Sequence, residues 1–313
     1  MACGGTPLRA DRQGASVRLS VVMSVFNGER DLTRTLDSIA AQSEGDFELI
    51  VVDDGSTDAT PSILSQYAAR DKRLRVITQS NAGLTRALIR GCDTAHAPII
   101  ARHDCGDTSL PERFAKQLAL FNDDDVVLAS CWMRWVGPQG ELLFVVQPTA
   151  GEARRSLLND SVNTIQGVPH VTAMFRRDAY IAAGGYRDAF YYAQDVDLWI
   201  RLAKRGRFAV VPEVLYETGY DIGAISAARR REQVALAEIA IAIRDGGNER
   251  ELLERARAIG RGSRRSSPRD SARALYFIAS CLRRNGDLRY KQYARAALRR
   301  DPLHLRSWLL LMR

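Results

Sequence analysis

The stretch LIVVDDGSTD, residues 49–58, ends a short apolar run on two adjacent carboxylates and a tight turn. A run of aliphatic residues that stops at Asp and Gly is typical of a buried strand followed by a turn. A second stretch of this kind, IIARHDCGD at residues 99–107, also leads from an apolar run into acids. Ligands of open α/β sheets bind outside the carboxyl ends of the strands, so these acids are placed to meet a ligand. Acids that only cap turns would give the same pattern, and this interpretation stays open for the first stretch.

The segments around these two stretches alternate in the same way. Short apolar runs and longer amphipathic stretches follow one another from Leu19, which predicts an α/β fold with a mostly parallel central sheet flanked by helices. Two helix starts are well marked, by Pro61 at a first helical position and by a capping box from Ser109 to Glu112. The expected strands are 19–24, 47–53, 74–78, 98–101 and 126–131, and the expected helices are 31–42, 60–69, 84–95 and 110–121.

The pattern weakens beyond residue 139. We expect a strand at 172–175, a turn at 184–186, a helix at 196–205 and a strand at 208–216. From about residue 226 the sequence becomes rich in Ala, Arg and Leu at helical spacing, and 260–268 has the composition of a linker. Residues 271–313 resemble a single tetratricopeptide hairpin. The expected organisation is therefore a loose tail (1–18), an α/β domain (19–226) and a helical C-terminal region (227–313).

Composition narrows the class of protein. The 313 residues are 46% hydrophobic and 26% charged, as in ordinary globular proteins, and the longest apolar runs are shorter than the ~20 residues that a membrane-spanning helix needs. Five scattered cysteines favour a reducing cytoplasm. Residues 229–313 carry 21 basic against 9 acidic residues. Nucleic-acid binding is not expected, because no aromatic-interleaved RNA motif is present, and the alternatives are peripheral contact with an anionic inner membrane surface or a plain solvated helix face.

Two clusters of acids suggest chemistry. Asp104 and Asp107 can place carboxylate oxygens around a hard divalent cation, which commonly shares a phosphate ligand. The stretch YYAQDVDLWIR, residues 191–201, sets acids beside aromatic residues at the start of a helix. The helix dipole alone accounts for one of these acids, whereas apolar neighbours would also suit a general base that faces a sugar. The chain contains no Walker A or G-x-G-x-x-G pattern.

Taken together, these stretches resemble the family 2 glycosyltransferases, which have the GT-A fold. The resemblance covers roughly residues 19–226 and rests on several ordered motifs: SVVMSVFNGE (20–29), DDGS (53–56), NAGLTR (81–86), DCGD (104–107), LPER (110–113) with Gln117, His170, MFRR (174–177), GGY (184–186) and QDVDLW (194–199).

The resemblance implies a single-displacement, inverting transfer of a sugar from a nucleoside-diphosphate donor to a hydroxyl acceptor of a cell-surface glycan or lipid-linked oligosaccharide. Asp195 would be the catalytic base, and Asp104 with Asp107 would hold Mg²⁺ or Mn²⁺. The other implied site residues are, for the nucleotide sugar, Phe26, Asn27, Glu29, Asp53, Asp54, Arg86, Arg102 and Asp104, and, for the acceptor side, His170, Asp197 and Trp199.

The sequence departs from the family pattern at three positions. Gly106 replaces the usual second acid of the D-x-D element, Gln194 stands where a glutamate is frequent, and Leu88 stands where an arginine is frequent. The Q-x-x-R-W signature of processive synthases is absent, so one sugar is expected per encounter. Two alternatives remain. One is an impaired relative that binds nucleotide sugar or acts as a scaffold; the other is a sugar nucleotidyltransferase, whose Gly-rich loop would need more than the single glycine of residues 22–30.

Overall fold

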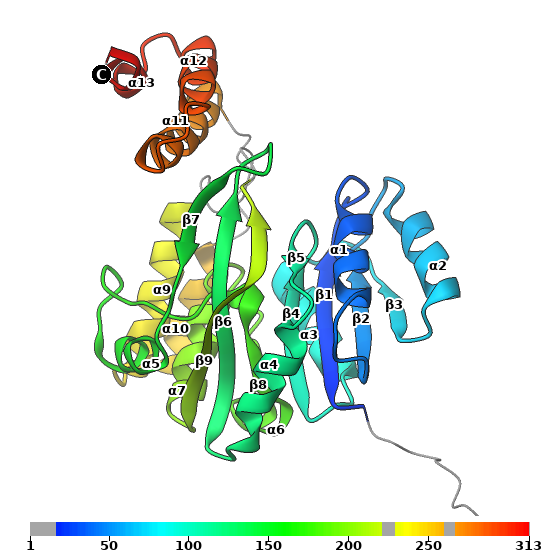
Figure 1. Ribbon diagram of the computed structural model, residues 1–313. Helices are drawn as coiled ribbons and strands as arrows, with labels where there is room; N and C mark the ends of the chain where they lie inside the picture. Colours follow the sequence, from blue (N-terminus) through cyan, green and yellow to red (C-terminus); the bar gives the residue numbers. More distant parts are fainter. Residues whose placement is uncertain (1–16, 221–228, 260–266, 313) are drawn as a thin grey trace, which may run out of the picture.

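The computed structural model describes residues 17–220, 229–259 and 267–312, and its centre is one mixed sheet (Figure 1). The strand order is β3-β2-β1-β4-β8-β6-β9-β5, with β7 added to β6. Neighbours among β1 to β4 pair in parallel, β6 and β9 are also parallel, and β8 is antiparallel to β4 and β6. The expected mostly parallel sheet is confirmed. The strands are β1 (Leu19–Val25), β2 (Phe47–Asp53), β3 (Leu74–Thr78), β4 (Ile99–Asp104), β5 (Thr108–Ser109), β6 (Val126–Val136), β7 (Leu142–Val146), β8 (Met174–Arg176) and β9 (Arg207–Gly219).

Helices cover both faces of this sheet. Those that follow β1, β2 and β3 are amphipathic connections between parallel strands, as the alternating sequence pattern predicts. The helices are α1 (Leu32–Ala40), α2 (Thr60–Arg70), α3 (Leu84–Thr94), α4 (Arg113–Ala119), α5 (Ala150–Asn159), α6 (Arg177–Ala182), α7 (Gln194–Ala203), α9 (Arg230–Arg244), α10 (Glu249–Ile259), α11 (Pro268–Arg284), α12 (Tyr290–Arg300) and α13 (Leu305–Met312), with single 3-10 turns η1 (Leu120–Asn122) and η2 (His170–Thr172).

Several element predictions need correction. The capping box at Ser109 is wrong, because Ser109 ends β5 and α4 begins four residues later. The Ser109 hydroxyl instead accepts a hydrogen bond from the Arg113 side chain at 2.9 Å. The strand expected at 172–175 is a 3-10 turn followed by β8. Neither α5 nor β7 was expected from the sequence pattern. The expected tail, the boundary near residue 226 and most of the expected linker lie outside the described residues.

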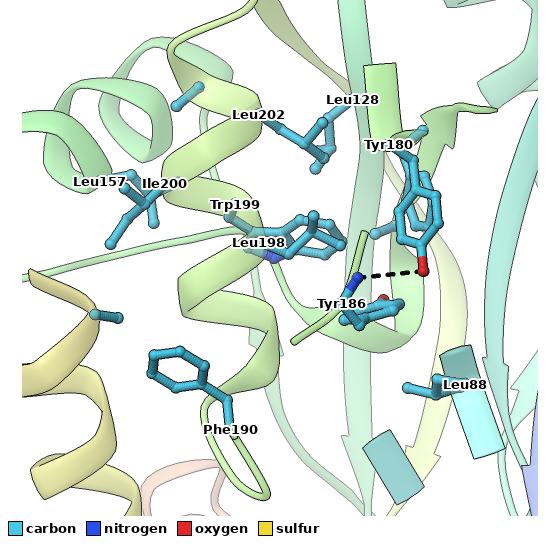
Figure 2. Close-up of a cluster of buried hydrophobic side chains, with 14 of the residues drawn as sticks. Leu88, Leu128, Leu157, Tyr180, Tyr186, Phe190, Leu198, Trp199, Ile200 and Leu202 are labelled. Carbon is cyan, nitrogen blue, oxygen red and sulfur yellow. Dashed lines mark hydrogen bonds between the residues drawn. The ribbon is translucent and has the colours of Figure 1, made fainter. Parts of the chain in front are cut away.

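Two apolar layers result from the alternation of side chains along the strands. Val21 and Met23 of β1 point into a core with α1 and α4, whereas Val22 points into a second core with α3 and α7. Figure 2 shows the second core around Trp199, which is 1% exposed and lies among leucines and tyrosines from α3, β6, α6 and α7. In this core the Tyr180 hydroxyl accepts a hydrogen bond from the backbone N–H of Tyr186. The buried side chains of α7 in this core hold the helix against the sheet.

The C-terminal helices form two groups. Helices α9 and α10 pack beside α7, and their apolar residues join the second core. Helices α11 and α12 form a hairpin that rests on the β6–β7 hairpin: the Asn285 amide donates to the carbonyls of Leu142 and Leu143, and the Tyr293 hydroxyl donates to Glu141. Within the described ranges, no helix has both the length and the apolar character needed to cross a membrane.

Candidate active site

The predicted nucleotide-binding acids meet where three adjacent strands end. In the sheet register Val25 of β1 pairs with Asp53 of β2, and Ser24 of β1 pairs with Asp104 of β4. Both acids therefore lie at the carboxyl edge of the sheet, and one strand, β1, lies between their strands. This edge is where α/β sheets bind ligands, as the sequence predicted.

The loop after β1 is fixed to the loop after β2. Asn27 has a left-handed backbone (φ 52°), which costs energy for a residue other than glycine. Its backbone N–H donates to the Ser56 hydroxyl at 2.9 Å, and its side-chain oxygen accepts from the Thr57 N–H at 2.8 Å. Glu29 accepts from the backbone N–H of Ala59 at 2.9 Å. These bonds hold Phe26, whose ring is 51% exposed, at the mouth of the site, where a planar base can stack on it.

Asp53 and Asp54 are both almost completely buried, and each orders nearby backbone. Asp53 accepts from the Ser56 N–H at 3.0 Å. Asp54 accepts from the Gln79 amide at 2.7 Å and from the Ala82 and Gly83 N–H groups at 2.8 and 2.7 Å. The turn-capping interpretation therefore holds for Asp53, which accepts from its own turn, whereas the oxygens of Asp54 are engaged by the loop before α3.

That loop packs against the aromatic ring of Tyr191. Gly83 has φ 89°, and a Cβ at this position would lie 2.4 Å from the ring of Tyr191. Tyr191 thus packs directly on the Gly83 backbone. The Thr85 hydroxyl donates to the Phe190 carbonyl at 2.8 Å, which ties α3 to the segment before α7.

Arg102 is a buried cation beneath the site. Its side chain is 0% exposed, forms an ion pair with Asp104, and donates to the carbonyls of Val22 at 3.0 Å and His103 at 2.8 Å. Burial opposes its charge, but Asp104 beside it raises the pKa of the guanidinium above its ordinary value. Asp104 is the more exposed partner, at 35%, so its carboxylate is held in place and is still partly open to solvent.

His170 belongs to the same network. Its Nε2 accepts from Arg102 Nε at 3.3 Å and lies 2.7 Å from the Tyr186 hydroxyl. Burial and the charge of Arg102 lower the pKa of His170 well below its ordinary value, so the imidazole is neutral at pH 7. His170 therefore supports Arg102, and Tyr186 completes the chain; the GGY motif was the sequence signal for Tyr186.

Asp107 is turned inward. Its Oδ2 accepts from the Tyr216 hydroxyl at 2.9 Å, and the same hydroxyl accepts from the Asp104 N–H at 3.3 Å. Burial and the nearby charge of Asp104 raise the pKa of Asp107 to about 7. Tyr216 was not predicted as a site residue, because it comes from β9, more than 100 residues along the chain, and nothing in its local sequence marks it.

Few side chains near Asp104 could bind a metal ion. The described residues hold no group of three or more His, Cys, Asp or Glu side chains able to bind a metal by themselves. Gly106, with φ 99°, leaves open space where the family has an acid. One exposed carboxylate with a buried second one nevertheless fits a Mg²⁺ or Mn²⁺ ion, because such ions take one or two carboxylates and complete their shell with substrate phosphates and water.

Asp195 lies in the first turn of α7, across from Asp104. The helix begins after Ala193, which has a left-handed backbone (φ 56°). Burial raises the pKa of Asp195, whereas backbone N–H groups of the helix start and the charge of Arg102 lower it, and Asp104 raises it again. The charges of Arg102 and Asp104 both act on this carboxyl, so the predicted base lies near the acid predicted to bind the nucleotide sugar.

Three other predicted residues are engaged by contacts of their own. Asp197 is 3% exposed and pairs with Arg187 and Arg201. Trp199 is buried and donates to the Val168 carbonyl at 3.1 Å. Arg86 pairs with Asp188 at 3.5 Å on the outer side of α3. The structure thus does not expose Asp197 or Trp199 to an acceptor.

This arrangement of fold and acids agrees with comparisons with known proteins. The family model "Glycosyl transferase family 2" matches residues 20–184, which is more than half of the chain. The chain belongs to the family 2 glycosyltransferases, and the expectation drawn from the motifs is confirmed.

Relatives and solved structures give the same class. A Bacillus subtilis (strain 168) glycosyltransferase, EpsE, is 33% identical over 65% of this chain and 73% of its own. The O-antigen biosynthesis glycosyltransferase WbnJ of Escherichia coli is 28% identical over 59% and 71%. Structures of S. aureus TarS with UDP (TM-score 0.57, 20% identity, 91% and 81% covered) and of the Pyrobaculum calidifontis mannosyltransferase PcManGT with GDP-Man and Mn²⁺ (0.56, 20%, 94% and 83%) share the GT-A fold.

Proposed function

We propose that this glycosyltransferase moves one sugar from a nucleoside-diphosphate sugar to a hydroxyl acceptor with inversion at the anomeric carbon. The observation that carries the proposal is the arrangement of Asp104 and Asp195 around buried Arg102, whose charge acts on both carboxyls. Two separate carboxylates suit a single displacement, in which one helps to hold the donor and the other activates the acceptor.

In this mechanism Asp195 accepts the proton of the acceptor hydroxyl while that oxygen bonds to the anomeric carbon. The bond from this carbon to the diphosphate oxygen breaks, and the nucleoside diphosphate leaves. Because burial raises the pKa of Asp195, its carboxylate is a stronger base than an exposed aspartate. Phe26 and the loops held by Asn27, Glu29, Asp53 and Asp54 would bind the nucleotide.

A divalent cation belongs to the proposal. Mg²⁺ or Mn²⁺ held by Asp104 would neutralise the charge that develops on the diphosphate. Asp107 would act behind Asp104 through the hydroxyl of Tyr216. The complex of PcManGT with Mn²⁺ supports a cation in this fold.

The names of the relatives support a polysaccharide as the product. WbnJ is named for O-antigen biosynthesis, and AmsE of Erwinia amylovora for amylovoran biosynthesis. We assign the acceptor to a growing cell-surface glycan or a lipid-linked oligosaccharide. We place the enzyme in the cytoplasm, at the inner face of the membrane.

Nucleotide binding tests this proposal. Melting temperatures are measured with UDP, GDP, TDP and CDP, each with Mg²⁺, Mn²⁺ or EDTA, for the wild type and Asp104→Ala, since a ligand of the folded state raises its melting temperature. We expect stabilisation by one nucleotide that depends on metal and is lost in the variant. If no nucleotide stabilises the wild type, the transferase proposal fails.

Gly106 favours a second candidate, a relative that binds nucleotide sugar without turning it over. Mass spectrometry of donor and products separates the two. Binding of a donor with neither transfer nor hydrolysis would support the second candidate.

A further inference from the structure

Helix α13 exposes an apolar face to solvent. Leu305, Trp308, Leu309 and Met312 are 74%, 46%, 55% and 77% exposed, and Leu303 just before the helix is 80% exposed. Their spacing of three and four residues places the four helical side chains on one face. Leu310 and Leu311 lie on the opposite face and pack against the α11–α12 hairpin. On the outward face, the Trp308 indole N–H also donates to the Pro302 carbonyl at 3.0 Å, whereas the three aliphatic side chains are mostly exposed.

The chain around this face is strongly basic. Residues 267–312 contain ten Arg and Lys against three Asp and Glu. Arg306 lies beside the apolar face on α13, and Arg295, Arg299 and Arg300 are exposed on α12. Such a surface repels a second copy of itself and attracts an anionic one. Apolar residues flanked by arginines are the composition of helices that lie in the plane of a bilayer interface.

The position of α13 matches the position of the active site. In Figure 1, α11 to α13 lie beyond the end of the sheet at which β1 and β6 finish, the same end at which Asp53 and Asp104 lie. The hairpin that carries α13 is fixed there by Asn285 and Tyr293. A surface bound to α13 would therefore lie on the side of the molecule on which the acceptor enters.

We propose that α13 docks on an anionic phospholipid bilayer, with Leu305, Trp308, Leu309 and Met312 inserted at the headgroup boundary and the arginines of α12 and α13 on the lipid phosphates. This proposal rests on the proposed function in one respect, since it explains how a lipid-linked acceptor is met. Docking would hold the carboxyl edge of the sheet, where Asp104 lies, close to the bilayer.

Vesicle sedimentation of the full chain tests the proposal. We expect the wild type to bind vesicles of phosphatidylcholine with phosphatidylglycerol, to bind pure phosphatidylcholine weakly, and to be released by salt. In the double variant Leu305→Glu, Leu309→Glu the partition coefficient should fall about tenfold or more, because two charges replace inserted apolar groups. Trp308 should shift its fluorescence to shorter wavelength on vesicles, and Trp308→Phe should lose this signal.

Ile181→Glu is the matched control. Ile181 is 56% exposed, slightly more than Leu309 at 55%, but it lies on α6 near the opposite end of the sheet. This variant should bind vesicles as the wild type does. Equal vesicle binding by the double variant and the wild type, or no binding by the wild type, would overturn the proposal. So would a dimer of the wild type that dissociates in the double variant, because the face would then belong to a second copy.

Nucleotide binding in solution is measured on the same preparations. Retained nucleotide binding without vesicle binding overturns the docking of α13 alone. Vesicle binding without nucleotide binding overturns the proposed transfer and supports the docking surface.

Discussion

The guanidinium of Arg102, fully buried under the sheet edge, forms an ion pair with the carboxylate of Asp104 two residues along the same strand. Side chains two residues apart on a strand share a face, so the pair follows from β4 itself. The carbonyls of Val22 and His103 accept from Nη1 of Arg102, and the imidazole of His170 accepts from its Nε. The position of the Asp104 carboxylate is thus set by a fully buried cation.

Replacement of Arg102 by Met should cost far more than loss of a surface ion pair. Asp104 would lose its partner, and the charge that lowers the pKa of Asp195 would be removed. Breaking a buried pair costs about 3–5 kcal/mol, whereas an exposed pair contributes about 0–1 kcal/mol. We expect weaker nucleotide binding and a lower melting temperature. Arg134→Met, which breaks the more exposed pair with Glu217, is the control and should leave both measurements nearly unchanged.

Substitutions of Asp195 and Asp197 should have different effects, the first on catalysis and the second on stability. Asp195→Asn removes the proposed base, and we expect about 10²- to 10⁴-fold lower kcat with unchanged nucleotide binding. Asp197→Asn breaks the buried pairs with Arg187 and Arg201, and we expect it to lower the free energy of unfolding by about 3 kcal/mol. Transfer assays and chemical denaturation of both variants measure these effects. If Asp197→Asn instead lost most of its kcat at unchanged stability, the assignment of Asp195 as the base would be wrong.

The pH profile gives a second measure of Asp195. The base acts when deprotonated, so kcat should fall as pH drops through its pKa in the enzyme–substrate complex. Burial raises this pKa above the ordinary 3.8, so the fall should come at higher pH than for an exposed aspartate. A profile that stays flat down to pH 4 would contradict the assignment.

The sequence predicted the first half of the sheet well, because β1 to β4 and their helices have strong periodicity. It also placed Asp53 and Asp104 at the correct edge, since that follows from parallel pairing. It could not predict that Ser109 would accept a hydrogen bond from the Arg113 side chain instead of capping a helix, because this depends on the folded positions of β5 and α4. The role of Tyr216 was equally hidden, since β9 brings it beside Asp107 only in the folded chain.

The residue at position 106 should determine how tightly the site binds nucleotide in the presence of a metal ion. The position has open space around it, since a Cβ added there would lie 4.0 Å from the side chain of Asp31, but its φ of 99° is strained for other residues. Gly106→Asp should add a carboxylate beside Asp104 and tighten Mn²⁺-dependent nucleotide binding, at a cost of about 1 kcal/mol in stability. Gly106→Asn has a similar shape without the charge and should show the cost alone. Calorimetric titration with and without Mn²⁺ measures the difference, and equal binding by the two variants would contradict the prediction.

Asp107 should make the folded protein less stable at neutral pH than at acid pH. Its pKa is about 7 in the folded state and near 3.8 in the unfolded chain, so the folded state binds the extra proton between these values. Its contribution to stability is therefore full below pH 4, declines as pH rises to 7, and stays low above that. Asp107→Asn removes this penalty, and at pH 8 it should be more stable than the wild type by about 2–4 kcal/mol.

Thermal denaturation from pH 5 to 8.5 measures the difference between the wild type and Asp107→Asn, which cancels the titration of the buried histidines. Asp124→Asn, at a fully exposed carboxylate, should show no such trend. Mn²⁺ with the correct nucleotide should reduce the penalty in the wild type, because a cation beside Asp104 offsets the repulsion that raises the pKa of Asp107. A wild type that gains stability over Asp107→Asn as pH rises would show that Asp107 is charged and well compensated in the folded state, which would contradict the prediction.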